Sequence, residues 1–315
     1  MTAVTVRVPA KVNLQLSVGP VRPDGYHEIA TIFHAVSLYD EVEVAPAERN
    51  VVAVTGEGAE SVPAGDGNLA MRAAAVLAEE TGQTRPAGIT IRKRIPVAAG
   101  LAGGSADAAA ALVACNELWR TGLSQAELGV LAARIGSDVA FALAGGTSIG
   151  RGRGEQLTPA LVTGQYHWVL AFAAGQLSTP EVYRACDRIR AARDVAVTRP
   201  KPGKALLAAL RSGDPAEVGP LLSNDLQPAA VSLQPELRRT LSIGRTAGAL
   251  GSVVSGSGPT CAFLVAGAEQ AVDLTVALSG AGVCRSAVRA TGPAQGAVVL
   301  SSVPGGKPSA RPAQP

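Results

Sequence analysis

Residues 96–106 have the sequence Pro96-Val97-Ala98-Ala99-Gly100-Leu101-Ala102-Gly103-Gly104-Ser105-Ala106. This loop joins a strand-like segment, 89–95, to an alanine-rich segment, 106–119, that predicts a helix. Glycines let backbone N–H groups come close to a ligand without an intervening side chain. The N-terminus of a helix adds unpaired N–H groups and a partial positive charge. The stretch therefore predicts either a cradle for the phosphates of a nucleotide or a flexible connection between strand and helix.

The loop differs from the two most familiar glycine-rich nucleotide motifs. It contains no GxxxxGK[ST] pattern, and Ala102 interrupts a GxGxxG pattern after Gly100. Ser105 is a candidate helix N-cap, or a hydroxyl that faces the phosphates or their magnesium. Asp107 lies in the first turn of the expected helix, where a carboxylate complements the helix dipole. The sequence does not identify the other magnesium ligands.

The composition is that of a folded protein with a weak positive charge. Hydrophobic residues make up 47% of the 315 residues and charged residues 17%, which favours packed cores, and the length suggests two domains. A net charge of +3 suits an anionic ligand and does not call for a nucleic acid. Widely spaced cysteines, no apolar signal segment and no apolar run of about 18 residues predict a cytoplasmic protein without a membrane partner.

Local patterns predict a mixed order of strands and helices, and hence an α+β protein. Asn68 and Gly82 are the expected start and stop of a helix, and Ser124 with Glu127 has the spacing of a capping box. Strands are expected at 4–18, 41–44, 51–55, 89–95 and 168–173, and helices at 69–81, 106–119, 124–136, 204–211 and 235–247. We expect a loop at 145–154 that leads into a strand, and a disordered tail at 303–315.

Several motifs, taken together in order, resemble those of the GHMP kinases. Three of them are Pro9-Ala10-Lys11-Val12-Asn13-Leu14, the glycine-rich loop, and Ser255-Gly256-Ser257-Gly258-Pro259. Three more blocks are similar to the branch of that family that phosphorylates a cytidine diphosphate-linked methylerythritol in the non-mevalonate isoprenoid route: Arg22–His27, Ile135–Phe141 and Ser178–Tyr183. The resemblance spans roughly residues 4–299. Ala99 and Ala102 stand where such kinases usually have glycine, and alanine allows fewer backbone angles.

The resemblance implies a two-domain GHMP kinase architecture with the active site in the cleft between the domains. An ATP-binding and catalytic domain would comprise residues 1–158, and a C-terminal GHMP kinase domain residues 159–302. The implied cofactors are ATP and Mg²⁺, with Ser105 as a candidate magnesium ligand. Lys93 and the loop residues Pro96 to Ala106 would hold the nucleotide.

The resemblance also assigns the chemistry to Lys11 and Asp138. From the residues alone, Lys11 could equally be a solvated cation at a strand edge and Asp138 a helix N-cap. Asp138 matches the catalytic aspartate of the family, and Lys11 matches the lysine beside it. A carboxylate next to the attacking hydroxyl can take its proton, and a nearby cation keeps that carboxylate ionised.

The substrate implied by the resemblance carries a cytidine diphosphate group, and its 2-hydroxyl is phosphorylated. Tyr26 and Tyr183 would stack on the cytosine, and His27 would bind its pairing edge. Asn13 and Thr179 would bind the diphosphate or the polyol. Arg151 and Arg153 receive no role.

Two other functions remain open at this point. Another GHMP kinase would act on homoserine, a sugar or a mevalonate derivative, and such substrates carry no base for a stacking pair. A non-catalytic RNA-binding protein is the second alternative, which the weak net charge and the scarcity of aromatic residues disfavour. The sequence does not predict an oligomeric state.

Overall fold

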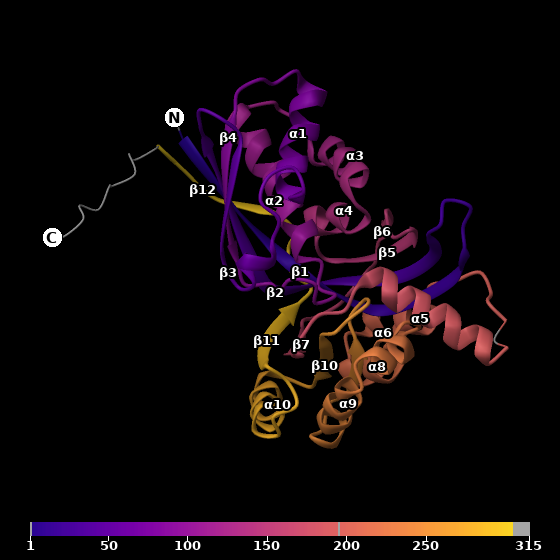
Figure 1. Cartoon of the computed structure of the whole chain (residues 1–315). Coiled ribbons are helices and arrows are strands. Elements are labelled where there is room, and N and C mark those ends of the chain that lie inside the picture. The colour runs from indigo at the N-terminus through magenta and orange to yellow at the C-terminus, as the bar shows by residue number, and fades with distance from the viewer. Residues whose placement is uncertain (1, 195, 305–315) are drawn as a thin grey trace.

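A computed structural model of the chain describes residues 2–194 and 196–304. It contains two sheets, and helices cover each of them (Figure 1). The two resulting parts of the molecule are in contact. The mixed strands and helices confirm the predicted α+β class. None of the helices in these residues is long and apolar enough to cross a membrane.

The first sheet has a path of five strands in the order β12-β1-β2-β4-β3, to which β5, β6 and β8 are added. Its two longest strands, β1 and β2, are antiparallel and have 20 residues each. Its strands are β1 (Thr2–Val21), β2 (His27–Pro46), β3 (Val51–Gly56), β4 (Ala87–Lys93), β5 (Thr147–Gly152), β6 (Gln156–Pro159), β8 (Ser223–Asn224) and β12 (Val298–Pro304).

Helices cover one face of the first sheet (Figure 1). They are α1 (Leu69–Thr81), α2 (Gly103–Trp119), α3 (Gln125–Ile135) and α4 (Ser137–Ala144), with a short 3₁₀ turn, η1 (Ala59–Ser61). The central helix is α2, which packs against β1 and β2 on one side and against α1 on the other. Ala108, Ala109, Ala110 and Ala111 of α2 are fully buried. Such small side chains let the helix lie close to the sheet, so a tight core forms with few aromatic residues.

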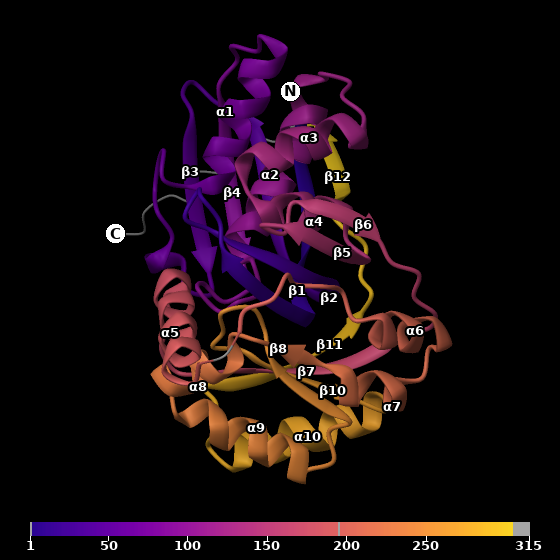
Figure 2. The same cartoon turned by 90° about the vertical axis from the view of Figure 1, so that its right-hand side faces the viewer.

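The second sheet has four antiparallel strands in the order β11-β7-β10-β9. They are β7 (Tyr166–Phe172), β9 (Gly251–Val254), β10 (Cys261–Val265) and β11 (Ser286–Gly292). The surrounding helices are α5 (Thr179–Ala192), α6 (Lys204–Ser212), α7 (Pro215–Val218), α8 (Gln227–Leu233), α9 (Glu236–Thr246) and α10 (Ala268–Gly280), with a 3₁₀ turn η2 (Gly219–Leu221). Figure 2 shows α9 and α10 beneath this sheet.

The part of the molecule built on the first sheet is called the first half below, and the part built on the second sheet is called the second half. The chain crosses between them more than once. β8 comes from the second half and pairs in parallel with β1, and β12 pairs antiparallel with β1. The predicted domain boundary at residue 158 falls in β6 and stays a prediction. The predicted tail, 303–315, begins inside β12, which runs to Pro304; residues 305–315 lie outside the described residues.

Three of the helix-end signals in the sequence are confirmed. Asn68 accepts a hydrogen bond from the backbone N–H of Ala70, and Gly82 ends α1 in the left-handed conformation. The Ser124–Glu127 capping box opens α3 as predicted. The expected loop at 145–154 was wrong, because six of its residues form β5 alongside β2.

Irregular pairing of β1 with β2 shapes the strand around Lys11. The register shifts between Pro9 and Ala10 and again between Asn13 and Gln15. Such bulges bend a strand and redirect its side chains. Lys11 and Asn13 lie between the two shifts and, being two residues apart, point to the same face of the sheet.

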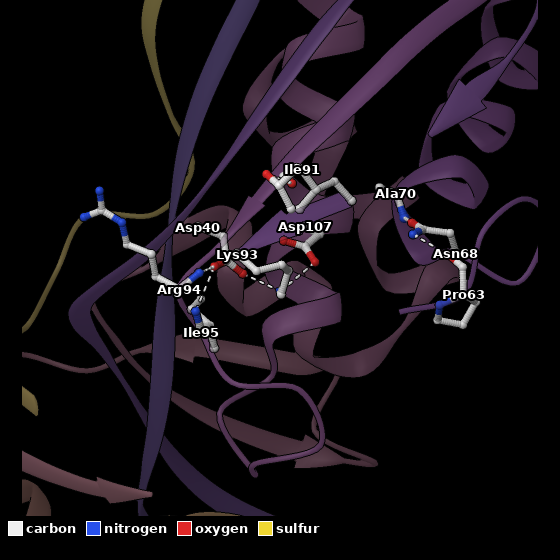
Figure 3. A network of polar contacts seen from close by, with 10 residues as sticks. Asp40, Pro63, Asn68, Ala70, Ile91, Lys93, Arg94, Ile95 and Asp107 are labelled. Carbon is white, nitrogen blue, oxygen red and sulfur yellow. Dashed lines mark hydrogen bonds and ion pairs between the residues drawn. The ribbon is translucent and has the colours of Figure 1, made fainter. Parts of the chain in front are cut away.

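A buried ionic cluster ties the ends of the glycine-rich loop to the sheet (Figure 3). Lys93, the last residue of β4, donates from Nζ to Asp40 of β2 and, at 2.8 Å, to Oδ2 of Asp107 in α2. The other oxygen of Asp40 accepts the backbone N–H groups of Arg94 at 2.6 Å and Ile95 at 2.8 Å. The cluster thus fixes the residues that enter the loop and the helix that follows it.

The charges of this cluster do not balance, because one ammonium faces two carboxylates. Burial lowers the pKa of Lys93, but attraction and hydrogen bonds from Asp107 and Asp40 outweigh it and leave the pKa raised. Burial raises the pKa of Asp107 to about 8, although Lys93 opposes the shift. Oδ1 of Asp107 has no hydrogen-bond partner among the described residues. Asp40 thus accepts three hydrogen bonds, from the ammonium and from two backbone N–H groups, whereas Asp107 accepts one. Burial favours the neutral form of Asp107.

The difference between Asp40 and Asp107 predicts different stabilities for two conservative variants. Asp40→Asn removes a buried carboxylate that accepts from Lys93 and from two backbone N–H groups, and should lower the free energy of unfolding by about 3–5 kcal/mol. Asp107→Asn replaces a carboxyl that favours its neutral form and should cost about 1 kcal/mol. Urea denaturation of both variants and the wild type at pH 7 measures these differences. Equal losses would contradict the assigned charge distribution.

The raised pKa of Asp107 also predicts a dependence on pH. Its carboxyl binds a proton more tightly in the folded chain, with a pKa of about 8, than in the unfolded chain, with the ordinary value of 3.8. The stability that the proton gives is complete below pH 3.8 and is lost as the pH rises towards 8. The free energy of unfolding of the wild type minus that of Asp107→Asn should therefore fall over this range, and a constant difference would contradict the shift.

Candidate active site

A cavity of about 1120 Å³ lies between the two halves of the molecule and contains residues from both. The first half contributes Lys11, Asn13, Tyr26, His27 and Asp138, and the second half contributes Thr179, Tyr183, Gly256 and Ser257. Motifs that are far apart in the sequence therefore meet at one place. Another cavity, of about 810 Å³, lies beside Arg190 of α5 and contains none of the predicted site residues.

Lys11 and Asp138 lie side by side in the cavity. Nζ of Lys11 is 3.8 Å from Oδ2 of Asp138, and the Lys11 side chain is 7% exposed against 32% for Asp138. Asp138 lies in the first turn of α4, whose N-cap is Gly136. Burial lowers the pKa of Lys11, and the nearby Asp138 partly opposes that shift. The pair offers a partly exposed carboxylate with a buried cation behind it.

Asn13 holds the ammonium of Lys11. Its Oδ1 accepts from Lys11 Nζ at 2.6 Å, and its Nδ2 donates to Oγ1 of Thr31 at 2.8 Å. The Thr31 hydroxyl in turn donates to the backbone oxygen of Gln15. This chain of hydrogen bonds sets the amide orientation of Asn13, so its oxygen is directed at Lys11.

The glycine-rich loop packs tightly against the turn Ser255–Gly258. Gly100 has φ +76°, and a Cβ there would lie 2.1 Å from the backbone oxygen of Ser255. Ser255 donates its hydroxyl to the backbone oxygen of Gly100 at 3.0 Å. A Cβ on Gly256 would come within 3.1 Å of Lys11 Nζ. Glycine is therefore required where the loop, the turn and Lys11 converge.

The N-terminus of α2 opens into the cavity without a side-chain cap. Its N-cap is Ala102, with φ 60°, so Ser105 is not the cap but the third residue of the helix. The backbone N–H groups of Gly103, Gly104 and Ser105 donate no hydrogen bond to the described residues. Ser105 itself lines the cavity. These unpaired donors and the helix dipole create a site suited to an anion.

The other predicted loop residues are placed differently. Leu101 and Ala106 are buried, and Pro96 and Val97 line a separate cavity of about 420 Å³ that also borders the loop. Lys93 does not line the main cavity, because its ammonium lies in the cluster with Asp40 and Asp107. Its assignment to the nucleotide stays a prediction.

Comparison with known proteins identifies the family. Residues 68–146 match the family model "GHMP kinases N terminal domain", and residues 206–284 match "GHMP kinases C terminal". A protein of Mycolicibacterium smegmatis named 4-diphosphocytidyl-2-C-methyl-D-erythritol kinase is 57% identical over 298 residues, which cover 95% of this chain and 92% of that protein. The chain belongs to the GHMP kinase family.

Two further relatives agree with this assignment. A Nocardia farcinica protein with the same name is 56% identical and covers 94% of this chain, and the match spans 96% of that protein. The crystal structure of a 4-(cytidine 5'-diphospho)-2C-methyl-D-erythritol kinase matches with a TM-score of 0.73 and 36% identity, over 91% of this chain and 98% of the other. As a GHMP kinase, the chain is an ATP-dependent small-molecule kinase, and the RNA-binding alternative is set aside.

In this GHMP kinase, Tyr26, His27 and Tyr183 line the same cavity as Lys11. Tyr26 is 57% exposed, and the guanidinium of Arg153 lies 5.0 Å from the centroid of its ring. Tyr183 packs on His27, with ring centroids 4.9 Å apart, and burial raises the pKa of its hydroxyl. One tyrosine is thus exposed at the cavity and the other is fixed against a histidine.

Thr179 connects two elements that line the cavity, α5 and the Ser255–Gly258 turn. Its hydroxyl lies 2.9 Å from that of Ser257, so the start of α5 contacts the Ser255–Gly258 turn. Pro180 follows it at the N-terminus of α5. Position and hydroxyl chemistry both agree with the predicted role of Thr179, which stays a prediction.

Sequence reasoning missed several residues of this cavity, among them Arg153, Arg184 and Asp187. Asp187 lies one helical turn after Tyr183, so the i, i+4 spacing on α5 was the available signal. Arg153 immediately follows β5, and its position depends on the pairing of β5 with β2, which the sequence did not indicate.

The alanines of the loop predict a stabilising substitution. Ala102 has φ 60°, a left-handed conformation that costs a residue with a Cβ about 1–2 kcal/mol. Ala102→Gly should therefore raise the free energy of unfolding by about 1 kcal/mol. In the exposed first turn of α3, Ala126→Gly is the matched control and should lower it by about 0.5–1 kcal/mol. Thermal denaturation compares the two, and a loss in both would show that the conformation of Ala102 is not strained.

Proposed function

We propose that this kinase transfers the γ-phosphoryl group of ATP to the 2-hydroxyl of 4-diphosphocytidyl-2-C-methyl-D-erythritol, in the non-mevalonate route to isoprenoid precursors. The observation that carries the proposal is that one cavity contains the Lys11–Asp138 pair, the uncapped start of α2, and the aromatic residues Tyr26, His27 and Tyr183. The names of the relatives that are more than half identical support the same substrate.

Asp138 is the proposed general base. Phosphoryl transfer depends on positioning and on neutralising charge more than on covalent catalysis. Asp138 is partly exposed to the cavity and can accept the proton of the attacking hydroxyl. Lys11, whose Nζ lies 3.8 Å from Oδ2 of Asp138, offsets negative charge around the transferred group.

The start of α2 is the proposed phosphate site. The unpaired N–H groups of Gly103, Gly104 and Ser105 would bind phosphate oxygens. The cavity beside Pro96 and Val97 is the proposed place for the nucleoside of ATP.

Mg²⁺ is the proposed metal, and the Ser105 hydroxyl is the group in the loop that fits it. Among the described residues no group of three or more histidine, cysteine or acidic side chains could hold a metal ion. That agrees with Mg²⁺, which usually keeps few protein ligands and binds through substrate phosphates. When bound, the ion would neutralise phosphate charge.

The part of the cavity around Tyr26, His27 and Tyr183 is the proposed site of the cytidine diphosphate group. Tyr26 offers an exposed ring for base stacking, and Tyr183 supports the ring of His27. Arg153 and Arg184 place positive charge where a diphosphate would lie. A substrate such as homoserine or mevalonate carries no base and would leave this part of the cavity unused, which disfavours the other GHMP kinase activities. The cytoplasmic location stays a prediction from the sequence.

A direct assay tests the proposed substrate. ADP release would be measured with ATP, Mg²⁺ and one of four alcohols: the cytidyl substrate, homoserine, galactose or mevalonate. We expect turnover on the cytidyl compound and none above background on the other three. Turnover on another alcohol alone would retain the kinase and reject the cytidine site.

Replacement of Asp138 tests the catalytic assignment. Asp138→Asn keeps the shape of the side chain but cannot accept the proton, so kcat should fall by about 10²–10⁴-fold. The Kd for ATP, measured by isothermal titration calorimetry, should change by less than about threefold, because the nucleotide is held elsewhere. A variant that retains more than a tenth of the wild-type kcat would remove Asp138 from the role of general base.

A further inference from the structure

The ring of His27 is held by a carboxylate from the other half of the molecule. Nε2 of His27, at the start of β2, lies 3.0 Å from Oδ1 of Asp187 on α5. The His27 side chain is 9% exposed, whereas that of Asp187 is 45% exposed. Tyr183, one turn before Asp187, packs against the ring at a centroid distance of 4.9 Å. Two residues of one helix therefore fix both the plane and one edge of the imidazole.

The second ring nitrogen faces a different environment. Nδ1 of His27 has no hydrogen bond to any of the described residues, and His27 lines the proposed substrate cavity. A neutral imidazole has one donor nitrogen and one acceptor nitrogen, and the partner of one nitrogen decides the role of the other. The Asp187 carboxylate is an acceptor, so it requires the proton on Nε2. Nδ1 is then left with a lone pair.

We propose that Asp187 is a positioning residue that, by holding the proton of His27 on Nε2, makes Nδ1 an acceptor for the exocyclic amino group of cytosine and sets a preference for cytosine over uracil. This inference rests on the proposed function. Cytosine presents an N–H donor at its 4-position, whereas uracil presents a carbonyl oxygen there. The Nδ1 lone pair would accept from the first and repel the second.

The discrimination follows from the cost of an unmatched buried polar group. A site built to hydrogen-bond one group rejects an analogue that leaves its polar atoms unpaired. With uracil, the Nδ1 lone pair of His27 would face the 4-carbonyl oxygen, and two acceptors repel one another. This repulsion adds to the lost hydrogen bond, so the site also selects by an unfavourable contact with the wrong base. Tyr26 and Tyr183 cannot supply this selection, because stacking on an aromatic ring tolerates any base.

Variants of α5 separate positioning from a merely structural ion pair. Asp187→Asn can present its amide NH₂ to Nε2 and permit the other tautomer, in which Nδ1 carries the proton. Asp187→Glu retains an acceptor at nearly the same place. Glu181→Gln is the matched control, because it removes one exposed negative charge from the same helix and does not line the cavity.

Kinetics with two substrates give the decisive measurement. kcat and KM would be determined for the cytidyl substrate and for its uridyl analogue, with ATP saturating. For Asp187→Asn we expect KM for the cytidyl substrate to rise about tenfold or more, with kcat and the KM for ATP within about twofold of wild type. The ratio of kcat/KM for cytidyl over uridyl substrate should fall by at least the same factor. Asp187→Glu should recover most of the ratio, and Glu181→Gln should leave it unchanged.

A spectroscopic measurement tests the tautomer without turnover. The chain has three histidines, so ¹⁵N-histidine labelling gives a simple spectrum, in which His27→Gln identifies the signals of His27. We expect a protonated Nε2 and an unprotonated Nδ1 in the wild type, and a mixture of tautomers in Asp187→Asn. A protonated Nδ1 in the wild type would overturn the inference, whether or not any variant folds well.

The outcomes also distinguish this inference from the proposed function. Wild-type turnover on the cytidyl substrate together with an unchanged substrate ratio in Asp187→Asn would retain the function and overturn the role of Asp187. No wild-type turnover on either the cytidyl or the uridyl compound would overturn both. A lower ratio with the expected tautomers would support both.

Discussion

The ammonium of Lys93, buried between the carboxylates of Asp40 and Asp107, links strands β2 and β4 to helix α2. The position of the glycine-rich loop depends on this link, because the link fixes where the loop leaves β4 and where α2 begins. Asp40 also accepts two backbone N–H groups at the loop entrance. Buried ion pairs contribute little net stability but make the loss of one partner costly. The cluster therefore specifies one arrangement of the loop.

A loop anchored at both ends can contain residues that glycine-rich loops usually avoid. Ala98 and Ala102 have φ values of 51° and 60°, in the left-handed region where a Cβ is unfavourable. On its other side the loop packs against the Ser255–Gly258 turn. Asn224 holds this turn, because its Nδ2 donates to the backbone oxygens of Val254 and Gly256 at 2.7 Å each. The strain is tolerated because the loop is enclosed by groups from both halves. A stiff loop keeps the N–H groups of α2 directed at the cavity before any ligand arrives.

The sequence predicted features that depend on near neighbours and missed those that depend on distant pairing. The helix ends at Asn68, Gly82 and Ser124 were found because each cap is formed by residues a few positions apart. β5 was missed because its sequence, TSIGRG, has two glycines and only one large apolar residue, so it lacks the alternation of apolar and polar residues that predicts a strand. Its pairing with β2 is what makes it a strand. Asp40 lies 53 positions from Lys93, and Asp187 lies 160 positions from His27, so nothing local indicated either contact. The motif resemblance brought the catalytic candidates together, whereas Asp187 required the structure.

The two buried lysines show how the neighbours of a cation decide its use. Lys93 has two acidic partners, Asp107 and Asp40, which leave its pKa raised against the effect of burial, so its ammonium is paired within the protein. Lys11 is held instead by the neutral amide of Asn13 at 2.6 Å, and its nearest carboxylate, on Asp138, is 3.8 Å away. Burial therefore lowers its pKa, since the charge lacks a close anionic partner. A cation that is buried but incompletely neutralised retains its attraction for an incoming anion, and the open side of Lys11 is the cavity that contains Asp138 and the start of α2.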